Sequence, residues 1–154
     1  MGPNKATILI KKAALEFDKN INAELEEYDL THSQYRVMKY LYRNEGQGVR
    51  TVDLERFFSM SHPTAIGIVQ NLEKKGLVRY RENPDNPHSR FIEPTEAGYG
   101  MKPILYAVGE KLETELTGNL SEEERLELVR LLRKMMGLDL TVGINQKRSC
   151  YAYV

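Results

Sequence analysis

Histidine and cysteine are the residue types most able to perform catalysis or bind a metal, and this chain of 154 residues has few of them. His32, His62 and His88 are widely separated and lack the clustered thiols or carboxylates of a zinc site. The sequence contains no nucleophile elbow and no phosphate-binding loop. Cys150 cannot form an internal disulfide, and it is either an incidental exposed thiol or a reactive one beside two basic residues. We therefore expect no enzyme, no metal and no resident cofactor.

Binding chemistry is instead indicated by the polar and basic side chains between residues 61 and 100. A helix is predicted over about 62–75, because Ser61 is a favoured cap and Gly76 suits a left-handed stop. Its buried face consists of apolar side chains spaced 4 and 3 residues apart, which are Ala65, Val69 and Leu72. Its outward face consists of Pro63, Gly67, Gln70, Asn71 and Lys74.

Two short strands follow this helix directly. Residues 77–81 alternate apolar and basic side chains, residues 83–87 have the asparagine and proline content of a turn, and residues 90–93 form the returning strand. A helix followed by a two-stranded wing has the shape of a module that enters one groove of DNA and touches the next.

Helices are predicted on both sides of this segment. The first covers about 5–28, the second is capped by Thr31 or Ser33, and Thr51 caps a short third helix with Leu54, Phe57 and Phe58 inside. Thr95 and Ser121 begin two later helices, and Pro103 kinks the first of these or marks a restart. The predicted fold class is mainly α with a small two- or three-stranded β-wing, a winged helix-turn-helix flanked by N- and C-terminal dimerisation helices.

We expect one structural domain with four parts. Residues 1–30 form an N-terminal dimerisation helix, 31–95 the winged helix-turn-helix, and 96–137 the C-terminal dimerisation helices. The tail at 138–154 has no clear period and is either disordered or docked on a neighbour through its tyrosines.

Charge and composition agree with this organisation. The net charge is zero, with 22 basic and 22 acidic residues, but residues 31–95 hold ten basic against seven acidic side chains. This mild bias suits a DNA-contacting middle flanked by acidic helices. The sequence has no long uncharged apolar run and no signal-peptide pattern, so we expect no membrane span and a cytoplasmic location.

Several motifs of this chain resemble those of the MarR family of bacterial transcriptional regulators. The resemblance covers about residues 5–137, and its most specific part reads S-x-x-T-x-x-x-x-V-x-x-L-E-x-x-G-L-V. It is carried by Ser61, Thr64, Val69, Leu72, Glu73, Gly76, Leu77 and Val78, followed by Thr95, Glu96 and Gly98. The resemblance implies a homodimer whose fourth helix enters the major groove while the wing reaches the minor groove. Many members of the family repress nearby genes and release DNA when a small aromatic or lipophilic effector binds.

This resemblance, together with the outward face of the helix, gives three sets of candidate residues. The predicted DNA contacts are Ser61, His62, Thr64, Ile66, Gly67, Gln70, Lys74, Arg79, Arg81, His88 and Arg90. The predicted effector pocket is lined by Tyr28, His32, Tyr35, Met38 and Tyr106. The predicted dimerisation residues are Ile10, Phe17, Ile21, Leu112, Leu116, Leu126, Val129 and Leu132.

The chain departs from the family pattern at two places. The family usually has serine and arginine where this chain has Ile66 and Gly67, and an aspartate-x-arginine pair at the wing tip where it has residues 86–88. Ile66 either touches a thymine methyl group or packs against the third helix. Arginine is the commonest specific reader of guanine, so we expect binding that depends on phosphates and prefers A·T-rich DNA.

The leading interpretation is a ligand-responsive, homodimeric repressor that binds a pseudo-palindromic operator in double-stranded DNA. The alternative is a winged-helix protein–protein interaction module with weak or no sequence-specific DNA binding. The neutral net charge and the missing arginines favour this alternative.

Overall fold

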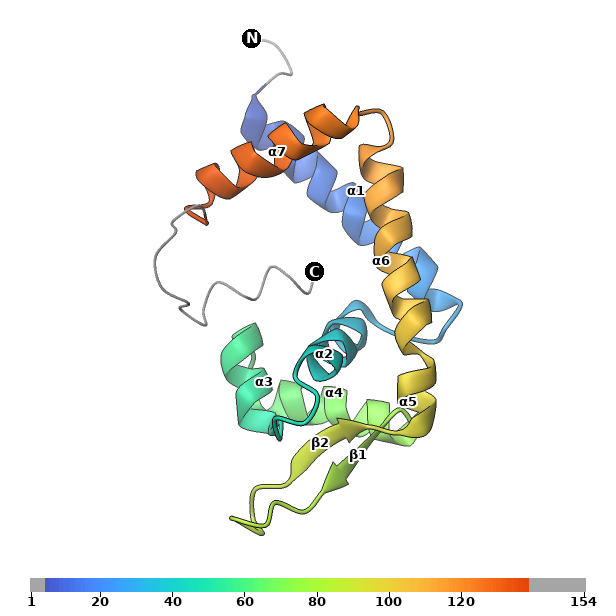
Figure 1. Ribbon diagram of the computed structural model, residues 1–154, viewed down its shortest axis with the longest axis vertical. Helices are drawn as coiled ribbons and strands as arrows, with labels where there is room; N and C mark the ends of the chain where they lie inside the picture. Colours follow the sequence, from blue (N-terminus) through green and yellow to red (C-terminus); the bar gives the residue numbers. More distant parts are fainter. Residues whose placement is uncertain (1–4, 139–154) are drawn as a thin grey trace.

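The chain folds into a set of helices with one short β-hairpin, and the computed structural model describes residues 5–138. Along the chain the elements are α1 (Ala6–Glu26), α2 (His32–Arg43), α3 (Thr51–Phe58), α4 (His62–Lys74), β1 (Val78–Arg81), β2 (Phe91–Pro94), α5 (Glu96–Gly100), α6 (Lys102–Thr117) and α7 (Glu122–Met135). Figure 1 shows α2, α3, α4 and the hairpin at one end of the molecule and α7 at the other, with α6 running between the two ends. The predicted mainly helical, winged fold is confirmed, with a two-stranded sheet in the described part of the chain. Cys150 and the tail beyond Leu138 lie outside the described residues.

Capping side chains set most of the helix starts. Hydroxyls of Thr31, Ser61, Thr95 and Ser121 each accept a hydrogen bond from the backbone N–H three residues later, as predicted. The prediction for Thr51 is wrong, because it is the first helical residue of α3. There the Asp53 carboxylate accepts from the backbone N–H of Arg50 at 2.8 Å, so an acidic side chain satisfies the free donor instead.

The hydrophobic core lies where α1, α2, α4 and α6 meet. Ile21 and Leu25 of α1 are fully buried, as are Leu105 and Leu112 of α6, and α1 packs directly on α6. Pro103 lies in the first turn of α6, where its missing N–H has no helical partner to lose, so the predicted restart is confirmed. Phe57 and Phe58 are only partly buried, unlike the fully buried Leu54 of the same helix.

The wing is an antiparallel hairpin in which Val78 pairs with Pro94 and Arg81 with Phe91. Val78 and Ile92 are buried, so their faces of the strands point to the core, whereas Arg79 and Arg81 lie on the opposite, outer face. The backbone of the α2–α3 loop adds one hydrogen bond from Ile92 N–H to Val49 O at 2.7 Å. The wing is thereby fixed on the helical body along one edge.

The backbone of α5 at Gly98 lies very close to the backbone at Leu77, just before β1. A Cβ on Gly98 would lie 2.1 Å from the carbonyl oxygen of Leu77, so only glycine fits at this position. The carbonyl oxygen of Gly98 accepts a 2.6 Å hydrogen bond from the buried hydroxyl of Tyr42 on α2. This contact joins α2 to the start of α5 and explains the glycine of the T-E-x-G motif.

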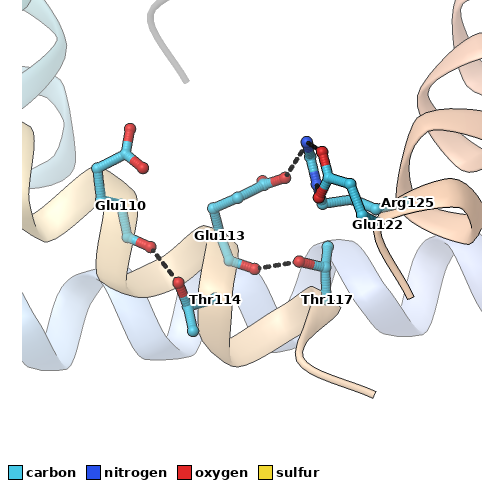
Figure 2. A network of polar contacts seen from close by, with 6 residues as sticks. All are labelled: Glu110, Glu113, Thr114, Thr117, Glu122 and Arg125. Carbon is cyan, nitrogen blue, oxygen red and sulfur yellow. Dashed lines mark hydrogen bonds and ion pairs between the residues drawn. The ribbon is translucent and has the colours of Figure 1, made fainter. Parts of the chain in front are cut away.

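The corner between α6 and α7 is held by polar contacts, which Figure 2 shows from close by. Arg125 of α7 reaches the Glu113 carboxylate of α6 at 3.4 Å and the Glu122 carboxylate at 2.6 Å. On α6, the hydroxyls of Thr114 and Thr117 donate to the carbonyls four residues earlier, at 3.0 and 2.6 Å. The Arg125–Glu113 pair thus links α7 to α6 at this corner, although α7 buries none of its own side chains.

Two of the predicted dimerisation residues lie elsewhere than expected. Ile21 is 0% and Leu112 is 1% exposed, because both pack between α1 and α6 of their own chain. Their side chains therefore offer no surface to a partner, and that part of the prediction is wrong. Leu116, Leu126 and Val129 are exposed, while Ile10, Phe17 and Leu132 are partly buried.

A membrane-crossing helix is also absent from residues 5–138, where no helix is both long and apolar enough.

Candidate nucleic-acid interface

The outward face of α4 is the best-formed polar surface of the predicted site. Ala65, Val69 and Leu72 are buried against the body of the protein. At 100° per residue, the direction opposite to them contains Pro63, Gly67, Gln70 and Lys74. Pro63, Gln70 and Lys74 are exposed. One stripe along the helix, spaced 4, 3 and 4 residues, is therefore free to contact another molecule.

Gly67 occupies the middle of this stripe. A Cβ built on Gly67 would meet no heavy atom within 4 Å, so the glycine is required neither by packing nor by a left-handed backbone. Its effect is to leave a gap in the side-chain stripe between Pro63 and Gln70. Ile66 is partly buried on the flank of the same helix. The sequence prediction for the outward face is thus matched in geometry, with its centre lacking a side chain.

The start of α4 presents hydroxyl groups and backbone donors. Ser61 and Thr64 are both exposed, and their hydroxyls lie 2.8 Å apart in a hydrogen bond. The helix N-terminus carries free N–H groups and a partial positive charge, which favour anions such as phosphate. His62 is exposed at the first turn, and its Nδ1 contacts the carboxylate of Glu55 on α3. This pair spans the turn between α3 and α4 and fixes the imidazole beside the helix start.

Arg79 and Arg81 of the wing are both engaged with one carboxylate. Glu93 pairs with Arg79 at 2.8 Å and with Arg81 at 3.0 Å. Partial burial alone would raise the pKa of Glu93, but the hydrogen bonds from the two guanidinium groups hold it below its usual value. The Arg81 guanidinium also lies 5.0 Å from the centre of the Phe91 ring. The two arginines and Glu93 together contribute one net positive charge on the outer face of the wing.

Arg90 lies differently from these two arginines. Its guanidinium carbon is 4.1 Å from the centre of the Tyr80 ring, on the opposite face of β1 from Arg79. Within residues 5–138 Arg90 forms no ion pair, and its side chain is exposed. By stacking on Tyr80, Arg90 lies on the same side of the hairpin as Val78 and Ile92, away from Arg79 and Arg81.

The wing tip is shaped by asparagine turns. The Asn83 side chain accepts from Asp85 N–H at 3.0 Å, and the Asn86 side chain accepts from His88 N–H at 3.0 Å. His88 is exposed on this loop. The tip thus holds an imidazole where the family pattern has an arginine.

The residues predicted to line an effector pocket lie around the junction of α1, α2 and α6. Tyr35 and Met38 are fully buried in the core, whereas Tyr28, His32 and Tyr106 are partly buried. The His32 ring lies 6.0 Å from that of Phe17 and 6.2 Å from that of Tyr35. A small cavity of about 100 Å³ adjoins Tyr35 and is lined by Phe17, Tyr35, Gly109, Leu112, Glu113 and Leu116.

Lys39 was missed by the sequence reading of this region. It is only 8% exposed, and its ammonium donates to the Tyr35 hydroxyl at 3.3 Å. Burial lowers the pKa of Lys39 and raises that of Tyr35 to about 12. Gly109 makes room for this pair, because a Cβ there would lie 3.1 Å from the Tyr35 hydroxyl. A lysine one turn after a buried tyrosine on an otherwise apolar helix face was the available signal.

Metal-binding geometry does not appear in this part of the molecule: no group of three or more His, Cys, Asp or Glu side chains within residues 5–138 could hold an ion.

Comparisons with known proteins agree with this geometry. A family model described as "MarR family" matches residues 28–86. The chain is 31% identical over 108 residues to the transcriptional regulator HosA of Escherichia coli O111:H-, covering 70% of this chain and 78% of HosA. It is also 31% identical over 122 residues to the HTH-type transcriptional regulator SarZ of Staphylococcus aureus, covering 79% of each protein.

Among solved structures, a mutant MarR from E. coli complexed with operator DNA matches with a TM-score of 0.72 and 26% identity. That match covers 83% of this chain and 91% of the MarR chain. The MepR–DNA complex of S. aureus matches with a TM-score of 0.75, covering 86% of this chain and 97% of that chain. At 24% sequence identity, this structural match shows a shared fold.

Proposed function

Because the chain belongs to the MarR family of transcriptional regulators, we propose that it is a homodimeric, ligand-responsive repressor that binds a pseudo-palindromic operator through α4 and the wing. The observation that carries this proposal is the outward stripe of α4, in which Pro63, Gln70 and Lys74 are exposed around Gly67, on a helix whose other face is buried. The stripe begins at a capped N-terminus and is followed at once by a hairpin, as DNA contact in adjacent grooves requires.

Exposed apolar surface on the terminal helices supports a homodimer. The large hydrophobic side chains left on the surface of α1 and of the segment from 116 onward are Ile8, Leu9, Leu15, Leu116, Leu120, Leu126, Leu128, Val129, Leu131, Met135 and Met136. Monomeric proteins rarely expose large apolar patches to water, so this number of exposed apolar side chains on the terminal helices favours a partner that covers them. A second copy would cover it by a two-fold contact and would present two α4 helices to half-sites roughly 34 Å apart.

The DNA preference follows from the side chains that α4 offers. Gln70 can bind adenine with two hydrogen bonds, and Lys74 can bind guanine or phosphate. Gly67 offers no side chain where an arginine would read guanine. We therefore expect sites rich in A·T pairs under α4, together with phosphate contacts from Ser61, Thr64 and Arg90.

The effector would bind at the junction of α1, α2 and α6. Phe17 and Tyr35 line the small cavity there. The His32 ring lies 6.0 Å from that of Phe17, and the Lys39 ammonium lies 5.8 Å from the centre of the Tyr106 ring. Such a mixture suits a planar aromatic or lipophilic molecule with a polar group. Binding at this junction would change how α2 packs on α6 and would thereby release the operator.

The test is fluorescence anisotropy of the purified protein with duplex DNA from upstream of its own gene, titrated over a series of salt concentrations. We expect saturable binding that weakens with salt. A double variant Gln70→Ala with Lys74→Ala should bind about tenfold or more weakly. Lys19→Ala, an exposed lysine on α1, is the matched control and should bind as the unmodified chain does.

A protein–protein interaction module is the second candidate. It is favoured by the zero net charge and by the pairing of Arg79 and Arg81 with Glu93, which leaves few cations for phosphates. If no protein concentration shifts the duplex at low salt, this second function replaces the first.

A further inference from the structure

Lys75 joins two parts of the molecule that are far apart in the sequence. Its ammonium donates to the backbone carbonyl of Asp29, lies 3.5 Å from the Asp29 carboxylate, and donates to the Gln34 side-chain oxygen at 3.0 Å. Three oxygens thus surround one ammonium, which has three protons to donate. The Lys75 side chain is 28% exposed and that of Asp29 is 92% exposed, so the hydrogen bond to the buried Gln34 side chain is the part of the contact that is shielded from water.

The two ends of this contact are defined structural positions. Lys75 is the C-terminal cap of α4, directly before Gly76, whose φ is +73°. Asp29 lies in the turn between α1 and α2 and has a φ of +53°, which is uncommon for a residue other than glycine. A turn held in this conformation presents its carbonyl oxygen in one fixed direction.

Gln34 ties the same ammonium to the start of α2. It is 5% exposed, and its side-chain oxygen also accepts from the backbone N–H of Thr31 at 3.2 Å. The backbone N–H of Gln34 in turn donates to the Thr31 hydroxyl at 3.2 Å. The capping box of α2 therefore holds the oxygen that Lys75 uses.

We propose that Lys75 is a positioning residue that sets the angle between the recognition helix α4 and the α1–α2 turn, and thereby the spacing of operator half-sites. The inference rests on the proposed homodimer, in which α1 belongs to the shared dimer surface. Lys75 itself need not contact DNA, because it acts through the C-terminal end of α4.

The expected sensitivity follows from the length of α4. A helix of 13 residues is about 20 Å long, and a rotation of about 10° about one end moves the other end about 3.4 Å. That displacement equals the rise of one base pair along DNA. Loosening the Lys75 contact therefore allows a movement as large as the axial part of a one-base-pair change in half-site spacing, and this relaxes the spacing requirement of the dimer.

The experiment uses the full chain and a duplex that it enriches from a random-sequence DNA pool. The same duplex is prepared with one base pair inserted or removed between the half-sites, and affinities are measured by anisotropy. Lys75→Met removes the ammonium and keeps the apolar stem, while Lys75→Arg keeps a charged donor. Lys111→Met is the matched control. It removes a lysine of α6 that pairs with Glu24 of α1, and this pair does not involve α4.

We expect the unmodified chain, Lys75→Arg and Lys111→Met to lose about tenfold in affinity when the spacing changes by one base pair. Lys75→Met should lose less than about threefold. A Lys75→Met variant that discriminates between the spacings as strongly as the unmodified chain overturns the inference. A general loss of stability would instead lower its affinity for the original, the lengthened and the shortened duplex alike. If the unmodified chain ignores the spacing or enriches no duplex, the proposed homodimeric function itself fails.

If Lys75→Met does not fold, the Asp29→Gly variant tests the inference instead. Glycine adopts a φ of +53° without strain and keeps the carbonyl while removing the carboxylate. When the spacing changes by one base pair, Asp29→Gly should lose less affinity than the unmodified chain and Lys111→Met do. It should still lose some affinity. Unchanged discrimination in Asp29→Gly would overturn the role of the Lys75 contact.

Discussion

Replacing Gly67 separates what α4 needs for folding from what it offers to DNA. Gly67→Ala places a methyl group where no heavy atom lies within 4 Å, so it causes no clash. Alanine is about 1 kcal/mol more favourable than glycine inside a helix. We therefore expect the free energy of unfolding to rise by about 1 kcal/mol and the melting temperature by about 2–4 °C.

The matched control is another glycine of the same chain. Gly98→Ala would place a methyl group 2.1 Å from the Leu77 carbonyl oxygen, and it should destabilise the protein by about 3 kcal/mol. Urea denaturation followed by circular dichroism measures both variants. If Gly67→Ala destabilises the protein, then the space around Gly67 is not open and the assignment of its face to DNA contact loses its basis.

Gly67→Arg extends the same reasoning to binding. An arginine at the centre of the outward stripe should read guanine, which is worth roughly 1–3 kcal/mol, or about 5- to 150-fold in affinity. The gain should appear only on duplexes with guanine at the facing position, measured by anisotropy against the same duplex with adenine. An equal gain on both duplexes would mean that the new side chain contacts phosphate, and no gain would mean that α4 does not lie in the groove.

Three further predictions concern buried hydroxyls and the wing. Tyr42→Phe removes the donor to the Gly98 carbonyl and should lower the free energy of unfolding by about 1–3 kcal/mol in urea melts, whereas a loss near zero would contradict the 2.6 Å bond. Because burial raises the pKa of Tyr35 from 10.0 to about 12, its contribution to stability is complete below pH 10 and is lost as pH rises through about 12, by about 3 kcal/mol. Tyr35→Phe should flatten stability over that pH range, and an unchanged alkaline slope would refute the shift. Arg90→Ala should lower the salt dependence of DNA binding by about one ion and weaken binding more than Arg79→Ala does, and the opposite order would place the outer face of the wing on DNA.

Local signals were sufficient to predict α4 and its faces. The cap at Ser61, the apolar spacing of Ala65, Val69 and Leu72, and the stop at Gly76 all depend on neighbours within a few residues. Each of these features therefore appears in the sequence pattern and again in the structure.

Features that depend on the pairing of distant segments could not be predicted in this way. The strand register decides that Glu93 faces Arg79, and the packing of α4 on the α1–α2 turn brings Lys75 to a residue 46 positions earlier. The apolar stripe of α1 was recognised, but its inward half at Ile21 turned out to pack on α6 of the same chain. Periodicity identifies a buried face and does not identify which chain covers it.

The most direct test of the central claim is selection of duplexes by the unmodified protein from a random-sequence DNA pool, followed by sequencing. We predict a pseudo-palindrome with half-site centres about 10 base pairs apart and A·T pairs at the positions facing Gly67. A consensus anchored on guanine at those positions, or a single half-site without a symmetric partner, would contradict it.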